Sequence, residues 1–241
     1  MAFRGPTPAE LYLDYGAPGT YLRIGNPNLE PESSNGFEIG ATYDNGSLRG
    51  RVTGFYNRYK NFIDTRDLSA AEQAALGIAP GTYPFGVTQS TNRANVEIYG
   101  AELSLEKQFD NGFNIHGGLA YARGVDLDTN EVLGSVAPFK GVIGVGYSTD
   151  IWGVDLSYIG AAAVSDNSTA HFKAPSYGIV DLTGWWKPEQ FEGLSIQAGV
   201  FNIFDETYYD AVALRDVSFT QPNSFYSEPG RTFKISITQK F

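Results

Sequence analysis

The sequence predicts an all-β fold, an antiparallel meander of about nine to ten strands that are each long enough to cross a membrane. Three observations support this prediction. Apolar and polar residues alternate with period two, turn signals such as Asp-Asn-Gly separate the alternating runs, and short connections alternate with long ones. Short turns on one side and long loops on the other are typical of outer-membrane barrels.

The strands follow one another along most of the chain. They are predicted at 33–43, 47–60, 93–109, 113–124, 139–149, 152–164, 176–187, 193–202 and 230–241. Short turns are expected at 44–46, 110–112, 150–151 and 188–192, and long connections at 61–92, 125–138, 165–175 and 203–229. Counting back from Phe241, every short turn falls on the side of the C-terminus. A soluble β-sandwich with irregular loops is the alternative, but it gives no reason for this alternation.

The longest connection contains one segment that does not fit a strand. Residues 69–76 read Ser-Ala-Ala-Glu-Gln-Ala-Ala-Leu, and Gly77 follows. A serine before an alanine-rich run and a glycine after it are the usual beginning and end of a helix. We expect a short helix within the loop.

Each strand has an apolar and a polar face. In 152–159 the even-numbered residues are large and apolar, whereas Asp155 and Ser157 lie on the other face. A barrel in a membrane would turn the polar face to its lumen. There the side chains could pair with one another, contact a plug or line a water path. The residues expected to face the lumen are Arg49, Arg51, Glu102, Glu106, His116, Lys140, Asp155, Asp181 and Lys234.

Aromatic residues gather at both ends of the predicted strands. Those beside short turns or the C-terminus are Phe109, Phe113, Tyr147, Trp152, Trp186 and Phe241. Those toward the long loops are Tyr56, Tyr99, Tyr121, Phe139 and Tyr158. Two such girdles are expected where aromatic rings lie among lipid headgroups. Ordinary cross-strand aromatic pairs would not separate by strand end.

Composition limits the classes of function. The net charge of −10 argues against a nucleic-acid-binding surface. The absence of cysteine excludes disulfides and thiolate metal sites. No run of 18 apolar residues and no secretory signal at Met1–Pro6 are present. Because a membrane barrel must be exported, we expect the chain to be a fragment, with open sheet edges at 33–43 and 230–241.

Catalytic and metal motifs are weak. A Ser/His hydrolase would need His116 or His171, and neither has a recognisable partner pattern, so we expect no enzyme. Asp126, Asp128 and Asn130 alternate like the start of a calcium loop, but residue 131 is Glu where that loop needs Gly, and residue 137 is Ala. A solvated acidic loop is favoured, and we expect no metal and no cofactor.

Several segments resemble motifs of the TonB-dependent receptors. Ala2–Tyr12 resembles their Phe-Arg-Ala-Pro box, and Gly25–Glu32 resembles the Asn-Pro-Asn-Leu box that follows it. Residues 98–103 resemble a mid-barrel strand of the family, 199–209 its penultimate strand end, and 229–241 its closing strand. The matches occur in order, with similar spacing, over nearly the whole chain.

This resemblance implies a 22-stranded barrel filled by an N-terminal plug that TonB pulls, using the proton gradient of the inner membrane, to admit iron chelates or other scarce nutrients. The plug domain is absent here. Residues 1–32 would form an extracellular-side segment with both boxes, and 33–241 the C-terminal portion of the barrel. The implied partners are outer-membrane lipid, the TonB complex through the missing plug, an iron chelate or similar nutrient, and the barrel-assembly machinery, which would read Phe241.

The segment between the two boxes bears on the ligand. Heme receptors of this family place a ligand histidine there, but residues 13–24 contain none. We therefore expect an iron chelate rather than heme, with Tyr15, Tyr21 and Arg23 as candidate ligand contacts, since aromatic and cationic groups suit anionic chelates. Packing within a loop is the alternative role for each. A passive outer-membrane pore or structural barrel, and less readily a soluble β protein or surface enzyme, are the alternative functions.

Overall fold

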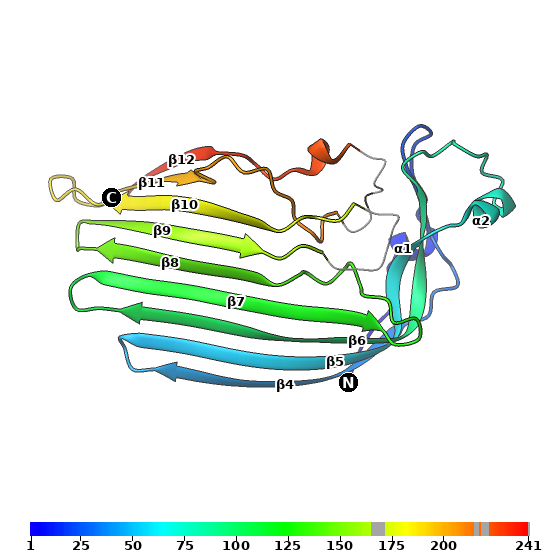
Figure 1. The fold of residues 1–241 in the computed structure, drawn as a ribbon, viewed down its shortest axis with the longest axis horizontal. Coiled ribbons are helices and arrows are strands. Elements are labelled where there is room, and N and C mark those ends of the chain that lie inside the picture. The colour runs from blue at the N-terminus through cyan, green and yellow to red at the C-terminus, as the bar shows by residue number, and fades with distance from the viewer. Residues whose placement is uncertain (165–171, 215–216, 218–221, 241) are drawn as a thin grey trace.

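A computed structural model describes residues 1–164, 172–214, 217 and 222–240. Nine long strands lie side by side in one open sheet (Figure 1). They are β4 (Glu32–Asp44), β5 (Leu48–Asp67), β6 (Val87–Gln108), β7 (Phe113–Asp126), β8 (Lys140–Ser148), β9 (Trp152–Ala161), β10 (Tyr177–Trp186), β11 (Leu194–Phe201) and β12 (Thr232–Gln239). Each pairs antiparallel with the next along the chain, which confirms the predicted meander.

Six short elements accompany the long strands, and all lie at the loop end of the sheet (Figure 1). They are β1 (Ala2–Arg4), α1 (Pro8–Tyr12), β2 (Tyr15–Gly16), β3 (Leu22–Ile24), α2 (Ala70–Ala75) and the 3₁₀ turn η1 (Asn223–Tyr226). The α2 helix begins after the Ser69 cap, as predicted. In the described part of the chain, no helix has the length and apolar character needed to cross a membrane.

The two edges of the sheet do not meet. Strand β12 is one edge, and β4 lies at the other. Strand β1 covers the loop end of β4, with Ala2 opposite Ser34 and Arg4 opposite Glu32. The predicted open edges are therefore present, but the first is shorter than expected because the chain start folds back onto it. Phe241 lies outside the described residues.

Two strand boundaries differ most from the prediction. Residues 61–92 were expected to be a connection, but β5 continues to Asp67 and β6 begins at Val87. The strands continue beyond Asn61, which has a positive φ of 54°. Ile63 and Val87 are buried in this extension. The extension is explained by local packing, since the buried apolar residues give the two strands a reason to stay paired beyond the predicted membrane span.

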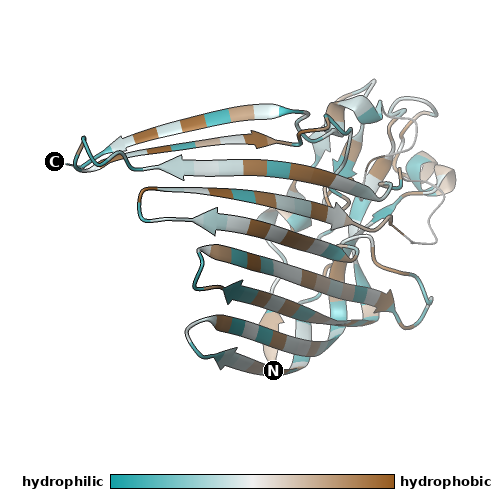
Figure 2. Ribbon diagram, turned by 60° about the vertical axis from the view of Figure 1, so that its left-hand side comes forward, coloured by the Kyte–Doolittle hydropathy of each residue, from teal (hydrophilic) through white to brown (hydrophobic). Residues whose placement is uncertain are grey.

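The pairing register arranges the apolar side chains on one face. Val145, Leu156 and Leu182 lie opposite one another across β8, β9 and β10, and Val200 and Phe233 continue the row on β11 and β12. Directly opposite residues share a face in an antiparallel pair. The alternation along each strand is visible in Figure 2. The predicted division into an apolar and a polar face is present throughout these strands.

The turn end of the sheet is tight and aromatic. Gly46 and Gly112 occupy turn positions with φ of 86° and 88°, a conformation that favours glycine. The ring centroids of Phe113 and Tyr147 lie 5.0 Å apart, and those of Tyr147 and Trp152 lie 5.3 Å apart. Phe113, Tyr147 and Trp152, three of the aromatic residues predicted beside the short turns, thus form a contiguous row on the apolar face.

Buried side chains concentrate at the loop end rather than in the sheet wall. Leu29, Ile63, Leu68, Val87 and Val96 are buried where the chain start meets the extended β5–β6 hairpin. A second cluster contains Ala174, Tyr209, Leu214 and Val217. We call the first region, formed by residues 1–31, 61–68 and 87–96, the loop-side layer.

Candidate functional site

The loop-side layer is anchored to the wall by the segment that resembles the first family box. Arg4 Nη1 binds Glu10 at 3.0 Å, and Arg4 Nε binds Glu32 at 2.9 Å. The hydrogen bond to Glu32 raises the pKa of Arg4 above its usual range. Burial opposes ionisation of Glu10, but the Thr7 N–H and Arg4 outweigh it and lower the pKa of Glu10. This arginine therefore ties helix α1 to the edge strand β4.

The segment that resembles the second box makes a network of amide bonds. Asn26 Nδ2 donates to the Ser90 carbonyl at 3.0 Å, and the Glu30 N–H donates to Asn92 Oδ1 at 2.8 Å. Asn92 Nδ2 donates in turn to the carbonyls of Glu30 and Asn61. Asparagine suits this role because its side chain both donates and accepts. The box residues hold the chain start against the β5–β6 hairpin.

Tyr15, Tyr21 and Arg23, the predicted ligand contacts, lie together between the two boxes. Strands β2 and β3 form a small hairpin in which Tyr15 lies opposite Arg23. The rings of Tyr15 and Tyr21 meet edge to face with centroids 6.1 Å apart, and each residue is 42% exposed. Strand β3 pairs in parallel with β6, which places Arg23 beside Thr88. The sequence pattern does not predict this parallel pair.

The guanidinium of Arg23 has neutral neighbours. Its Nη2 donates to Thr65 Oγ1 at 3.1 Å and approaches Ser90 Oγ at 3.5 Å. Within the described residues it makes no ion pair. A cation held by hydroxyls, with two exposed tyrosines on the same hairpin, leaves positive charge available to an anionic ligand. Because the two tyrosine rings also pack on each other and Arg23 bonds to the β5–β6 hairpin, the geometry fits either a ligand contact or loop packing.

The polar residues predicted to face a lumen share one face of the sheet. The register places Arg49, Glu106, His116 and Asp181 in a single row across β5, β6, β7 and β10. Glu102 lies opposite Thr53 and Ala120, two steps along the same face. The shared face is a fact of the structure, whereas its orientation toward a lumen stays a prediction.

Most of these polar side chains have a partner on the same face. Arg49 pairs with Asp44 at 3.1 Å, and Arg51 Nε lies 3.4 Å from Thr53 Oγ1. Lys140 pairs with Asp210 at 3.2 Å, so this lysine holds the connection after β11 rather than a wall residue.

The remaining members of the set lie on β7 to β12. His116 Nδ1 lies 3.5 Å from Asp155 Oδ2, and Ser157 Oγ donates to Asp155 Oδ1 at 2.6 Å. Because the serine donates to the carboxylate rather than to the imidazole, this is not the arrangement of a Ser/His nucleophile. Asp181 accepts the Asn202 N–H at 2.7 Å, and Lys234 lies over the Phe201 ring. His171 lies outside the described residues.

Sequence reasoning missed the most connected side chain of the loop end. Arg93 donates from Nε to Asp64 at 2.7 Å and from Nη1 to Asp126 at 3.0 Å and Glu131 at 2.7 Å. Asp126 also accepts the N–H groups of Asp128 and Thr129. The acidic stretch once compared with a calcium loop is therefore used to bind an arginine and to cap its own turn. In the described part of the chain, no group of three or more His, Cys, Asp or Glu side chains is placed to hold a metal ion.

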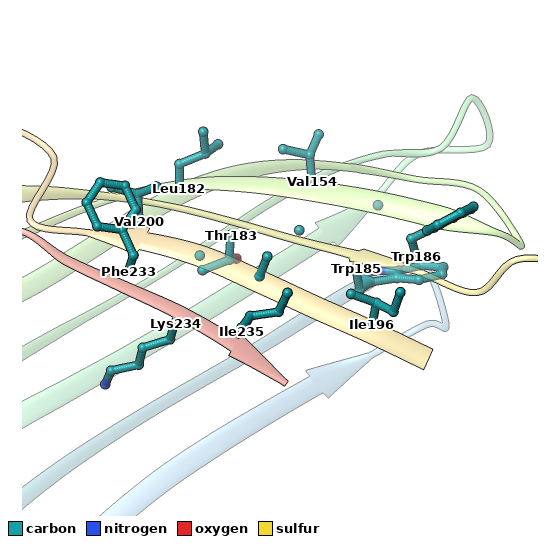
Figure 3. Close-up of a pocket in the computed structure, with 14 residues that line it drawn as sticks. Val154, Leu182, Thr183, Trp185, Trp186, Ile196, Val200, Phe233, Lys234 and Ile235 are labelled. Carbon is teal, nitrogen blue, oxygen red and sulfur yellow. The ribbon is translucent and has the colours of Figure 1, made fainter. Parts of the chain in front are cut away.

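An apolar groove lies elsewhere, on the sheet wall. Figure 3 shows it over β9 to β12, where Leu182, Trp186 and Phe233 are among the side chains that line it. The small residues Gly184 and Ala198 also belong to its lining. Its volume is about 590 Å³. It is lined mainly by the apolar face that the membrane prediction turns toward lipid. We therefore place the candidate ligand site on the β2–β3 hairpin and not in this groove.

The architecture described so far defines a class, the outer-membrane type of antiparallel barrel wall. The family model described as TonB dependent receptor-like, beta-barrel matches residues 1–203. The chain therefore belongs to the TonB-dependent receptor family, as the sequence motifs predicted. Members of this family are receptors and transporters rather than enzymes, in agreement with the expectation of no enzyme.

Proteins similar to this chain are named for several different ligands. The hemoglobin-haptoglobin-binding protein A of Haemophilus influenzae is 28% identical over 100% of this chain and 25% of its own length. The rhizobactin receptor of Rhizobium meliloti is 24% identical over 100% of this chain and 32% of its own length. The structure of the copper transporter OprC shares the fold with a TM-score of 0.79 at 22% identity, over 100% of this chain and 36% of its own. The chain thus spans about a quarter to a third of these relatives.

Proposed function

We propose that this chain is the C-terminal barrel portion of an outer-membrane receptor that takes up an iron chelate, or a similar scarce nutrient, with energy supplied through TonB. In this proposal residues 1–32 are the extracellular-side segment and residues 33–241 complete the barrel wall. The observation that carries it is the family match together with an intact pair of family boxes, whose side chains fix the β2–β3 hairpin at the loop end.

The charged polar face supports the same proposal. A row of ionisable side chains on one face and an uninterrupted apolar row on the other suit a wall with a wet lumen and a lipid-facing exterior. A plug within the lumen would contact TonB, and the terminal Phe241 would serve the barrel-assembly machinery. A passive pore has the same wall but needs neither the boxes nor the hairpin.

The ligand we favour is an anionic iron chelate recognised by Tyr15, Tyr21 and Arg23. Aromatic rings stack on flat ligands, and an arginine that has no carboxylate partner among the described residues can pair with a chelate's negative charge. Heme is the second candidate, because relatives of this chain are named for hemoglobin and heme. The residues that would bind heme through an imidazole are missing from 13–24.

The test uses the full-length receptor that contains this chain, expressed in a strain that lacks other iron receptors. We expect growth on a ferric catecholate and not on heme, and no growth without TonB. The double variant Tyr15→Ala/Arg23→Gln should weaken uptake at least tenfold at unchanged surface level. Tyr12→Ala is the control, because Tyr12 is an exposed tyrosine of the same segment.

Each outcome assigns the function differently. Growth on heme that His171→Ala abolishes would replace the chelate proposal with heme uptake through a loop histidine. Solute entry that continues without TonB would support the passive pore. Uptake unaffected by Tyr15→Ala/Arg23→Gln would return those residues to a packing role.

A further inference from the structure

The apolar face of the wall carries charge in two places. Among the described residues of β4 to β12 outside the loop-side layer, the charged ones on this face are Lys107 near the turn end and four residues at the loop end. Those four are Arg58, Lys60, Glu97 and Arg123, which all lie on β5 to β7. The register fixes their face, since Tyr56 lies opposite Tyr99, and Tyr99 lies opposite Arg123. We call Arg58, Lys60 and Arg123 the outer basic patch.

The three cations are close together and exposed. Arg58 and Lys60 point from the same face of β5, about 7 Å apart along the strand, and Arg123 lies two strands away, at about 10 Å. None of the three has an ion pair or side-chain hydrogen bond within the described residues. Glu97 lies opposite Arg58, but its Oε2 accepts a hydrogen bond from the Tyr56 hydroxyl at 3.0 Å. The patch is therefore positive within a chain whose net charge is −10.

The patch lies next to an aromatic band. Phe37, Tyr56 and Tyr121 are exposed on the same face, with Tyr56 one step nearer the middle of its strand than Arg58 and Tyr121 one step nearer than Arg123. Aromatic rings favour the boundary between hydrocarbon and headgroups, so the residues just beyond them lie at the level of the headgroups. Lysine and arginine at that level pair with phosphate. Cations between the two ends of the strands would face hydrocarbon, which explains why this face carries no charged residue between the patch and Lys107 near the turn end.

We propose that the outer basic patch binds the phosphate groups of an anionic membrane lipid. The inference rests on the proposed function in one respect, namely that the apolar face contacts lipid. An anionic lipid is the expected occupant for two reasons. The cations are exposed on a lipid-facing surface, and they lie directly beyond a girdle of aromatic rings, at the level of the headgroups. A second copy of the chain would bring the same positive charges and lacks this complementarity.

The experiment uses the full-length receptor, folded in a zwitterionic detergent, and diphosphoryl lipid A as the probe. Native mass spectrometry measures the lipid retained by the receptor and by the triple variant Arg58→Gln/Lys60→Gln/Arg123→Gln. Each cation near an anionic lipid contributes about fivefold in affinity, so the triple variant should bind on the order of a hundredfold more weakly. Lys107→Gln, a cation at the other end of the same face, should bind like the parent.

The same lipid without its phosphates supplies the second arm. The parent should bind this phosphate-free lipid as weakly as the triple variant binds the phosphorylated one. Heat-modifiable gel mobility shows whether each variant is folded, and the single variants, each about fivefold weaker, replace the triple variant if it does not fold.

Three results would overturn the proposal: equal retention by parent and folded variants, displacement of the lipid by inorganic phosphate, or a change in oligomeric state with lipid binding intact. Iron-chelate uptake is measured in the same variants. A receptor that takes up no chelate but shows the lipid difference would refute the proposed function and leave the patch assigned. Normal uptake without a difference in lipid binding would support the proposed function and refute the assignment of the patch.

Discussion

The sheet wall exposes its apolar side chains, whereas the loop-side layer buries them. On β12, Phe233 is 73% exposed and Ile235 is 70% exposed, whereas Val96 and Val87 in the loop-side layer are 0% and 1% exposed. The wall is held by main-chain pairing between neighbouring strands, and its apolar face has no cover within the described chain. The loop-side layer is instead held by its own buried residues and by side-chain hydrogen bonds. The wall therefore depends on its surroundings for stability, and the layer does not.

The sharpest test of this comparison is the 241-residue chain by itself in plain buffer. The strand edges of β4 and β12 expose unpaired backbone groups, and long exposed edges pair with other chains. The uncovered apolar face adds to this tendency. We expect aggregates by size-exclusion chromatography with light scattering, and dispersion only when detergent or the remaining strands are supplied. A cooperative, monodisperse monomer would contradict both the membrane assignment and the dependence of the wall on its surroundings.

Within the loop-side layer, Arg93 should be the most sensitive residue. Replacing Arg93 by Met removes ion pairs to Asp64, Asp126 and Glu131 and leaves the 6% exposed carboxylate of Asp126 without its cation. Removing one partner of a buried pair costs about 3 kcal/mol or more. Limited proteolysis in 125–138 should become much faster, while the wall stays folded by heat-modifiable mobility. Arg49→Met is the control, since its pair with Asp44 is exposed and contributes at most about 1 kcal/mol.

The same cluster predicts how the local stability of residues 125–138 changes with pH. Burial acts to raise the pKa of Asp126, but Arg93 and the N–H groups of Asp128 and Thr129 lower it further than burial raises it. A carboxylate whose folded pKa is lowered stabilises the fold above its unfolded pKa, and that contribution is lost as the pH falls through the folded pKa. Proteolytic protection of 125–138 should therefore decline under acid. Protection that is independent of pH would remove the ion pairs as its source.

The wall should respond to which face receives a charge. Leu156→Arg places a cation on the apolar face and should cost about 2–4 kcal/mol if it lies near the membrane midplane, whereas Ser157→Arg on the polar face should be tolerated. Folding into lipid vesicles at increasing urea measures both variants. Equal tolerance at the two neighbouring positions would sink the assignment of the two faces.

The wall was predictable from sequence, and the layer was not, for a physical reason. A strand that separates lipid from water must alternate apolar and polar residues. The sequence shows this alternation directly around Trp152, Leu156 and Ile196. Arg93, by contrast, binds carboxylates at positions 64, 126 and 131, and sequence spacing carries no information about contacts between such distant residues. The parallel pairing of β3 with β6 also joins distant segments, and three residues are too few to show a period.

The candidate ligand contacts were predictable only in part. Tyr15, Tyr21 and Arg23 came from the resemblance to the family boxes and from the missing histidine, and the structure gathers them on one hairpin. Their short spacing along the chain accounts for this proximity. The hydroxyl neighbours of Arg23 at positions 65 and 90 were beyond the reach of sequence reasoning.

The hairpin itself should be sensitive to a single methyl group. Gly16 has a φ of 141°, and a Cβ atom there would collide with the Tyr21 carbonyl oxygen across the β2–β3 pair. Gly16→Ala should cost roughly 1–3 kcal/mol of local stability, because neither the backbone conformation nor the space suits a side chain. We expect weaker chelate binding at an unchanged folded fraction of the wall. Gly5→Ala is the matched control, since a Cβ at Gly5 meets no atom within 4 Å. Unaltered binding in Gly16→Ala would separate the hairpin from the ligand site.

The smallest expected effect is confined to α2, at the tip of the loop-side layer. Glu72 accepts bonds from Arg66 at 2.8 Å and from the N–H and hydroxyl of Ser69, and together these lower its pKa from 4.5 to about 2. Its contribution to the helix is therefore complete above about pH 4.5 and is lost as the pH falls from there toward 2.

Hydrogen-exchange protection factors of α2 should decline over that pH range, and Glu72→Gln should lower them at neutral pH and remove the decline. Glu189→Gln, in the short turn before β11, should change neither. Because α2 carries no buried residue, the wall should keep its protection in every case. A loss of protection in the wall strands on Glu72→Gln would show that the two regions are energetically coupled, against the comparison drawn here.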